Sequence, residues 1–241
     1  MNNSKNNSKN IDFSPEEMLV CYNKEFGMVE AYKSIRTNIM YSMPRTEGGK
    51  VIALTSSTAS EGKTTTVINL ALTFAQVNAK VLIIDCDLRK PKVHRYLRIE
   101  RKDGLSNVLC GFSDLKDAIK VGVKENLDVL TSGEVPPNPA ELLQTEAFEK
   151  VLEVLKKSYD YIIIDTPPIN IVTDAIFPIK HSEGTILLTK KDYTTYDMVE
   201  QALEKIRRVD ANVIGTIMID NKENDNISVY RKSKYGYRYK E

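Results

Sequence analysis

A segment of ten residues, 56–65 (S-S-T-A-S-E-G-K-T-T), has the residue types and spacing of a phosphate-binding loop. Backbone N–H groups at a helix start lack partners and carry the positive end of the helix dipole, so they attract a polyphosphate. Gly62 permits close approach of the backbone, Lys63 can reach the terminal phosphates, and the Thr64 hydroxyl can ligate Mg²⁺. In the pattern G-x-x-x-x-G-K-[ST], Ser57 replaces the first glycine. We expect a nucleotide to contact Ser57, Thr58, Ala59, Ser60, Glu61, Gly62, Lys63, Thr64 and Thr65.

Two apolar runs end in aspartates that such a site needs: Asp85 and Asp87 after the first run, and Asp165 after the second. Ligands in an open α/β sheet bind beyond the carboxyl ends of the strands, so all three should face the loop. A carboxylate there either caps the next helix or meets a cation, and with Thr64 these three are expected to hold Mg²⁺. Asp85 or Asp87 is also expected to accept a proton from an attacking hydroxyl, while Lys63 acts on the transferred phosphate. We expect Lys63 to lie in an exposed loop, where its replacement costs little stability.

Segments of strand and helix character alternate along the chain, which predicts a mostly parallel sheet with helices on both faces. Strands are expected at 51–56, 80–86, 127–131, 160–165, 184–189 and 213–219. Helices are expected near 63–76, 139–157 and 195–209, with shorter ones near 105–109 and 114–119. The phosphate-binding loop then connects the first strand to a helix, which is the context that its chemistry requires.

Composition limits the kinds of partner. The 241 residues are enough for one α/β domain, and 34 Lys+Arg balance 33 Asp+Glu, so we expect no nucleic-acid partner. No apolar run approaches the ~20 residues that span a bilayer, and no signal peptide is visible. The three cysteines, Cys21, Cys86 and Cys110, lack metal-ligand spacing and are expected to be reduced. These features predict a cytoplasmic protein, unless a partner holds it at a membrane.

The N-terminal part differs from the rest of the chain. Residues 1–15 are mostly polar and are expected to be disordered, whereas 16–220 should form the domain. That domain includes a helical arm that begins near Pro15 and continues through 28–41. Three charged residues share one flank of the arm: Glu30, Lys33 and Arg36. They either are solvated or pair with another subunit.

The final segment, 221–241, holds four of the twelve tyrosines: Tyr230, Tyr235, Tyr237 and Tyr239. Five basic residues are interleaved with them. One interpretation is a nucleic-acid or membrane patch, since both bind basic and aromatic side chains. We favour a flexible tail that reaches an active site and is phosphorylated there. Four phosphates would turn a local charge of about +5 into about −1 to −3.

Together these motifs resemble the bacterial tyrosine kinases that control capsule and exopolysaccharide synthesis. The similarity covers nearly the whole chain from about Phe26, and several motifs carry it. They are the loop 56–65, the Asp-x-Asp-x-Arg motif at Asp85, Asp87 and Arg89, the D-T-P-P run at Asp165, Asp174 after it, the G-E-V-P-P-N-P-A-E-L-L run at 133–143, and the tyrosine cluster.

The resemblance implies a P-loop NTPase fold of the deviant-Walker (MinD/ParA-like) class, with ATP and Mg²⁺ as cofactors. It also implies phosphorylation of the tail between subunits and ring-shaped self-assembly through Glu30, Lys33 and Arg36. A transmembrane adaptor of the polysaccharide co-polymerase type would activate the kinase and recruit it to the inner face of the membrane. The implied protein substrates act in nucleotide-sugar and polysaccharide metabolism.

The sequence departs from that family at two places, and two rival functions remain. Ala59-Ser60 replaces a frequent Pro-Gly, and Lys33 replaces an arginine, which weakens bidentate pairing. The first rival is a partitioning or septum-positioning ATPase, whose signature lysine corresponds to Thr58 here. The second is a nucleotide-dependent scaffold for the adaptor, which would not need the complete set of aspartates.

Overall fold

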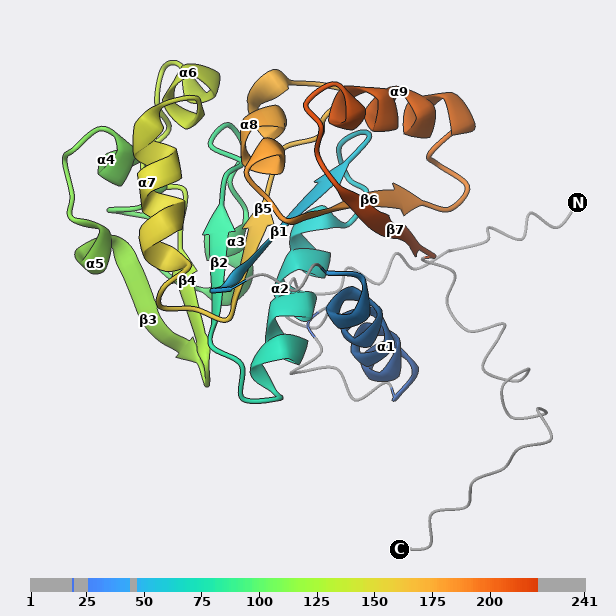
Figure 1. The fold of residues 1–241 in the computed structure, drawn as a ribbon, viewed down its shortest axis with the longest axis horizontal. Helices are drawn as coiled ribbons and strands as arrows, with labels where there is room; N and C mark the ends of the chain where they lie inside the picture. Colours follow the sequence, from blue (N-terminus) through green and yellow to red (C-terminus); the bar gives the residue numbers. More distant parts are fainter. Residues whose placement is uncertain (1–18, 20–25, 44–46, 221–241) are drawn as a thin grey trace, which may run out of the picture.

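The computed structural model describes Leu19 and residues 26–43 and 47–220 (Figure 1). The N-terminus expected to be disordered (1–15), the start of the helix expected from Pro15, and the tyrosine-rich tail (221–241) lie outside the described residues. Within the described part, a central sheet is covered by helices on both faces, as the alternating pattern predicted.

The sheet has seven strands in the order β3-β4-β2-β5-β1-β6-β7 within the described residues. Six of them run parallel: β1 (Lys50–Ser56), β2 (Val81–Asp85), β4 (Leu127–Leu130), β5 (Tyr161–Asp165), β6 (Gly184–Lys190) and β7 (Val213–Ile219). At one edge β3 (Ile119–Lys124) pairs antiparallel with β4. Because β2, β5 and β1 are neighbours, the segments that follow them meet at one edge of the sheet.

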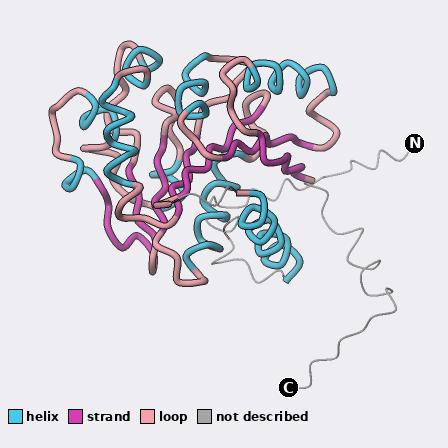
Figure 2. Tube along the Cα trace, viewed as in Figure 1, coloured by secondary structure: helices cyan, strands magenta, loops and turns pink. Residues whose placement is uncertain are grey.

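Each face of the sheet forms its own hydrophobic core, and Figure 2 shows the strand layer between the helices. Along β1, Ile52 and Leu54 enter one core while Val51 and Ala53 enter the other, as the two-residue period of a strand requires. The first core is covered by α1 (Phe26–Ser42), α2 (Lys63–Ala75) and α3 (Val93–Leu97). The second is covered by α4 (Leu105–Leu109), α5 (Leu115–Ala118), α6 (Pro139–Leu143), α7 (Glu146–Leu155), α8 (Ile176–Lys180) and α9 (Tyr196–Arg207).

The structure corrects several expected elements. The helix expected near 139–157 is two helices, α6 and α7, and the chain from 119 continues as strand β3, which the sequence pattern did not predict. The short helices α3 and α8 were also missed, as was a 3₁₀ turn at Thr173–Ala175. None of the helices in the described part has the length and apolar character needed to span a bilayer.

Candidate active site

The phosphate-binding loop connects β1 to α2, as predicted. Gly62 precedes the helix with φ +83°, and an added Cβ there would lie 3.5 Å from the Ile219 side chain at the end of β7. Ser60 also has a left-handed backbone, with φ 65°, a conformation that costs a residue other than glycine about 1–2 kcal/mol. The loop is thus held in a tight shape even though serine occupies a position that suits glycine.

Lys63 and Thr64, the first two residues of α2, both contact Asp165 at the end of β5. Lys63 Nζ lies 2.9 Å from Asp165 Oδ1, and Thr64 Oγ1 donates to Asp165 Oδ2 at 2.7 Å. Lys63 is 8% exposed and Asp165 is fully buried, so the expectation of an exposed lysine was wrong. Burial lowers the pKa of Lys63, but the Asp165 carboxylate beside it outweighs this and raises it. Lys63 is therefore a charged, buried group with an ionic partner.

Asp85 lies directly beside Asp165, because the two residues are paired in the register of β2 and β5. It is fully buried, and its carboxylate accepts hydrogen bonds from the backbone N–H groups of Asp87 (3.2 Å) and Val93 (3.3 Å). Burial, together with the charges of Asp165 and Asp87, raises the pKa of Asp85 well above its usual range. Two carboxylates thus meet at the end of two adjacent strands, where a cation would stabilise both.

Asp87 is more accessible than Asp85. Its Oδ1 accepts the Lys90 N–H at 3.0 Å, and burial raises its pKa, although Lys63 partly opposes this effect. Cys86 between the two aspartates is buried, and burial, with Asp85 next in importance, raises the pKa of its thiol well above the usual range. Cys86 is therefore a protonated core residue, as the strand alternation predicted.

The turn that carries Asp87 is fastened by a bidentate ion pair. Arg89 Nε lies 2.7 Å from Asp174 Oδ2, and Arg89 Nη2 donates to Asp174 Oδ1 at 3.1 Å. Asp174 is 1% exposed and Arg89 is 46% exposed, so the acid is the buried partner. This pair ties the segment after β2 to the segment after β5.

Glu61 holds the phosphate-binding loop to a distant segment. Its carboxylate accepts the Thr58 N–H at 2.8 Å and the Thr194 hydroxyl, and Glu61 is 1% exposed. Thr194 Oγ1 in turn accepts the Lys190 N–H at 2.8 Å. The sequence had placed Glu61 only among nucleotide contacts, and nothing in the sequence pointed to Thr194. Glu61 is thus a residue of the loop whose buried side chain holds the loop in place.

The residues present fit a nucleotide with a divalent cation. Ser57 Oγ and Thr58 Oγ1 are buried in the loop without a hydrogen-bond partner among the described residues, as groups that await a ligand would be. The nearby Thr64, Asp85, Asp87 and Asp165 offer only oxygen atoms, which Mg²⁺ prefers. No three acidic, His or Cys side chains in the described part are placed to hold a metal ion by themselves. This donor set agrees with a Mg²⁺ ion whose remaining ligands are phosphate oxygens of the nucleotide.

The residues expected to mediate assembly lie on α1, away from the loop. Lys33 Nζ pairs with Glu30 Oε1 at 2.7 Å on the helix surface. Arg36 Nη1 instead donates to the Thr73 carbonyl oxygen at 2.6 Å, near the end of α2. All three residues therefore have partners within this chain, and Glu30 and Lys33 are in addition exposed enough to meet a neighbour. The four tail tyrosines lie outside the described residues.

Comparisons with known proteins agree with this geometry. The AAA domain family matches residues 49–219. Tyrosine-protein kinase YwqD of Bacillus subtilis is 38% identical over 208 residues, which are 86% of this chain and 85% of that protein. Among solved structures, the chimerical protein CapA2B2 has a TM-score of 0.80 at 34% identity and covers 88% of this chain and 92% of its own.

The deviant-Walker ATPases share the fold at lower similarity. The septum site-determining protein MinD of Pyrococcus horikoshii, solved with Mg-ADP, has a TM-score of 0.63 at 25% identity, over 73% of this chain and 72% of that chain. This likeness confirms the predicted P-loop NTPase fold, and the kinase relatives are closer in both measures. The chain belongs to the family of bacterial tyrosine-protein kinases.

Proposed function

We propose that this chain is an ATP-dependent protein-tyrosine kinase that phosphorylates its own C-terminal tyrosine cluster. One observation carries the proposal: Lys63 and Thr64 of the phosphate-binding loop converge on Asp165, with Asp85 beside it. A cation from a helix start and carboxylates from two strand ends are the groups that phosphoryl transfer requires.

The contacts support a division of roles among the carboxylates. Asp165 is bonded to Thr64 and fits a group that orients Mg²⁺, which when bound would neutralise charge on the phosphates. Both oxygens of the buried Asp85 already accept backbone hydrogen bonds. Asp87 is more accessible, and burial raises its pKa, which makes its carboxylate a better acceptor for the proton of a tyrosine hydroxyl. We assign the base to Asp87 and a metal-binding role to Asp85 and Asp165.

Lys63 has two partners in this scheme. Without a nucleotide it pairs with Asp165, and in the reaction it would bind the oxygens of the transferred phosphoryl group. The loop N–H groups and the hydroxyls of Ser57 and Thr58 would hold the other phosphates. Movement of one lysine from a carboxylate to a phosphate is a change that only the bound nucleotide drives.

The wider biology is proposed on the family relationship. The kinase would regulate capsule or exopolysaccharide synthesis, assemble as rings through Glu30, Lys33 and Arg36, and modify proteins of nucleotide-sugar and polysaccharide metabolism. A transmembrane adaptor would recruit it from the cytoplasm to the inner face of the membrane. Exposed ion pairs of the kind that α1 offers contribute only about 0–1 kcal/mol each, so assembly should weaken with salt.

The test is incubation of the purified chain with Mg-ATP, with and without the cytoplasmic segment of an adaptor, followed by mass spectrometry of phosphotyrosine. We expect phosphate on Tyr230, Tyr235, Tyr237 and Tyr239. A Lys63→Met chain with an intact tail, mixed with an active chain whose four tail tyrosines are phenylalanine, should gain phosphate if transfer occurs between subunits. Hydrolysis of ATP without any phosphotyrosine would favour the ATPase-switch function instead, and nucleotide binding without either reaction would favour the scaffold.

A further inference from the structure

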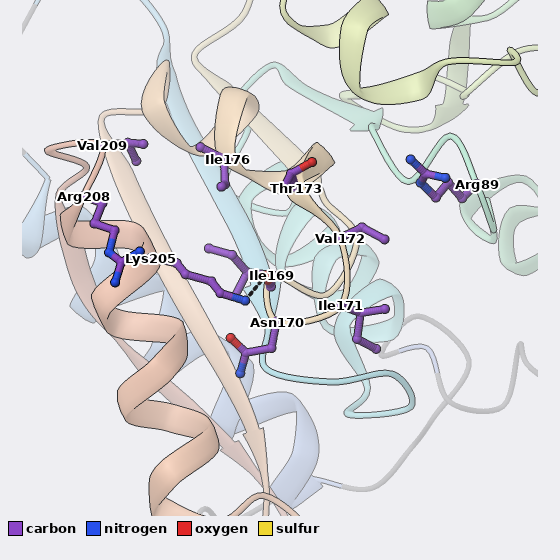
Figure 3. Close-up of a pocket in the computed structure, with 10 residues that line it drawn as sticks. All are labelled: Arg89, Ile169, Asn170, Ile171, Val172, Thr173, Ile176, Lys205, Arg208 and Val209. Atoms are coloured by element: carbon purple, nitrogen blue, oxygen red, sulfur yellow. Dashed lines mark hydrogen bonds between the residues drawn. The ribbon is translucent and has the colours of Figure 1, made fainter.

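An open hollow of about 510 Å³ lies between the segment after β5 and the last turns of α9 (Figure 3). Isoleucine and valine side chains form much of its lining, and Ile171 at its rim is 58% exposed. Lys205 of α9 and Arg208, the residue after that helix, lie at one end, while Arg89 lies at the other end (Figure 3). The lining contains none of the groups that converge on Asp165, so this is a separate surface next to the candidate active site.

The α9 end of the hollow carries positive charge that the protein leaves largely uncompensated. Lys205 Nζ donates to the Ile169 carbonyl oxygen at 3.1 Å, and none of the ion pairs among the described residues includes Lys205. Arg208 Nη2 is 3.8 Å from Glu204 Oε2, a long contact between two exposed side chains that is worth little. At the other end, Arg89 is neutralised by Asp174. An anion would therefore bind at Lys205 and Arg208.

An apolar lining beside two cations whose charge is largely uncompensated suits an aryl phosphate. The ring of phosphotyrosine can pack on isoleucine and valine, while its phosphate accepts charge-assisted hydrogen bonds from arginine and lysine. A hollow of this size falls within the range of ligand sites, about 300–1,000 Å³. The unmodified tail carries five basic residues among its tyrosines, so it would be repelled here until it is phosphorylated.

We propose that this hollow binds phosphotyrosine of the phosphorylated C-terminal segment, 221–241, of this chain. The inference rests on the proposed kinase function and adds a second site for the tail. Unmodified, the tail is basic and complements the acidic site of Asp85, Asp87 and Asp165. Phosphorylated, it is acidic and complements Lys205 and Arg208. Reversal of its charge thus transfers the tail from one surface to the adjoining one, and clears the active site for the next substrate.

Binding is measured on the full chain, purified without ATP and treated with a phosphatase. The probe is a fluorescent synthetic peptide of residues 228–241 with phosphate on Tyr235, Tyr237 and Tyr239, followed by fluorescence anisotropy. Two matched peptides serve as controls: the unphosphorylated sequence, and one in which glutamate replaces these three tyrosines. We expect each control to bind at least about tenfold more weakly, because neither supplies both the ring and a doubly charged phosphate.

The protein variants separate this site from general charge attraction. Lys205→Ala/Arg208→Ala should weaken binding of the phosphopeptide about tenfold or more, whereas Lys150→Ala/Arg207→Ala, which removes the same charge outside the hollow, should change it less than about twofold. Ile171→Asp tests the apolar rim independently at an exposed position, and it should also weaken binding. Melting curves confirm that each variant is folded.

Equal binding by the wild type and Lys205→Ala/Arg208→Ala would overturn the proposal, as would equal binding of the phosphopeptide and the glutamate peptide. Competition by inorganic phosphate as strong as that by free phosphotyrosine would reduce the site to an anion site and would also overturn it. Because the peptide is synthetic, binding does not require kinase activity. A chain that binds the peptide but forms no phosphotyrosine would refute the kinase proposal and leave the hollow as a phosphotyrosine site.

Discussion

Asp85→Asn should make the nucleotide-free protein more stable while it lowers phosphotyrosine formation. Asp85 is fully buried beside Asp165, and the pKa of its carboxyl is raised well above the usual range by burial and by neighbouring carboxylates. Asparagine has nearly the same shape and keeps an oxygen that can accept a backbone N–H. The substitution therefore removes a poorly placed negative charge without opening a cavity.

The size of the gain follows from the strand spacing. Paired residues on neighbouring strands are about 4.8 Å apart, and two unit charges at ~5 Å with an effective dielectric constant near 20 repel by about 3 kcal/mol. Lys63 and the two backbone donors of Asp85 offset part of that repulsion. We expect a net gain of about 1 to 2 kcal/mol, in the usual range for relief of strain at a functional site. For a protein of this size, that raises Tm by about 2 to 8 °C.

The pH dependence of Tm checks independently that Asp85→Asn stabilises the protein. Because the folded-state pKa of Asp85 is raised, the folded protein binds more protons than the unfolded chain between the two pKa values. The wild type therefore loses stability as pH rises from about 4 through the folded-state pKa, and Asp85→Asn does not have that loss. The gap in Tm between the two proteins should widen as pH rises from about 4 through the folded-state pKa of Asp85 and then stay constant in a scan to about pH 8.

The assay is differential scanning fluorimetry across that pH range, together with the phosphotyrosine measurement at pH 7.5. The matched control is Asp117→Asn, an exposed position on α5, which should stay within about 0.5 kcal/mol of the wild type. A Tm for Asp85→Asn that equals or falls below that of the wild type at every pH would refute the reasoning. It would mean that other groups already compensate the negative charge of Asp85 in the nucleotide-free protein.

Three further outcomes are expected. Lys63→Met should abolish transfer and also lower the free energy of unfolding by about 3 kcal/mol, because Asp165 stays buried without its cation; an unchanged urea midpoint would contradict this. Ser60→Gly should raise stability by about 0.5 to 1 kcal/mol, since glycine adopts φ 65° without steric cost; thermal melts that show a loss would contradict it. Thr194→Val removes the hydroxyl that donates to Glu61, so steady-state kinetics should show KM for ATP rising more than kcat falls; the reverse pattern would exclude a role in holding the loop.

The sequence predicted the strands well where burial on both faces left a clear signal. Apolar runs such as Val81–Asp85 and Tyr161–Asp165 read as strands because nearly every position is covered. The edge strand Ile119–Lys124 alternates apolar residues with lysine and contains Gly122 at φ +68°, so it lacked that signal. The helix expected near 139–157 breaks at Gln144 and Thr145, where neither proline nor glycine marks the break. Those elements are fixed by tertiary packing rather than by local preference.

The sequence named the residues of the candidate site but not the contacts that they make. Lys63 and Asp165 were found from local motifs, yet their ion pair joins residues 102 positions apart, and local patterns carry no information about it. The hydrogen bond between Glu61 and Thr194 spans 133 positions. For the same reason the burial of Lys63 was missed: the covering groups come from other strands. Motif spacing reports what a loop can bind, whereas its resting partners depend on the whole sheet.

Those resting partners determine which contacts a nucleotide must displace in order to bind at the candidate site. The site holds one cation, Lys63, and the three carboxylates of Asp85, Asp87 and Asp165. A nucleotide by itself would therefore bring the negative charge of its phosphates to a site that is already negative. Only a nucleotide that arrives with Mg²⁺ reverses this balance, since the cation offsets the carboxylates that the protein leaves unpaired. Binding must also break the contacts of Lys63 and Thr64 with Asp165. The same aspartate that would orient the metal therefore also holds the two loop residues that would bind the nucleotide.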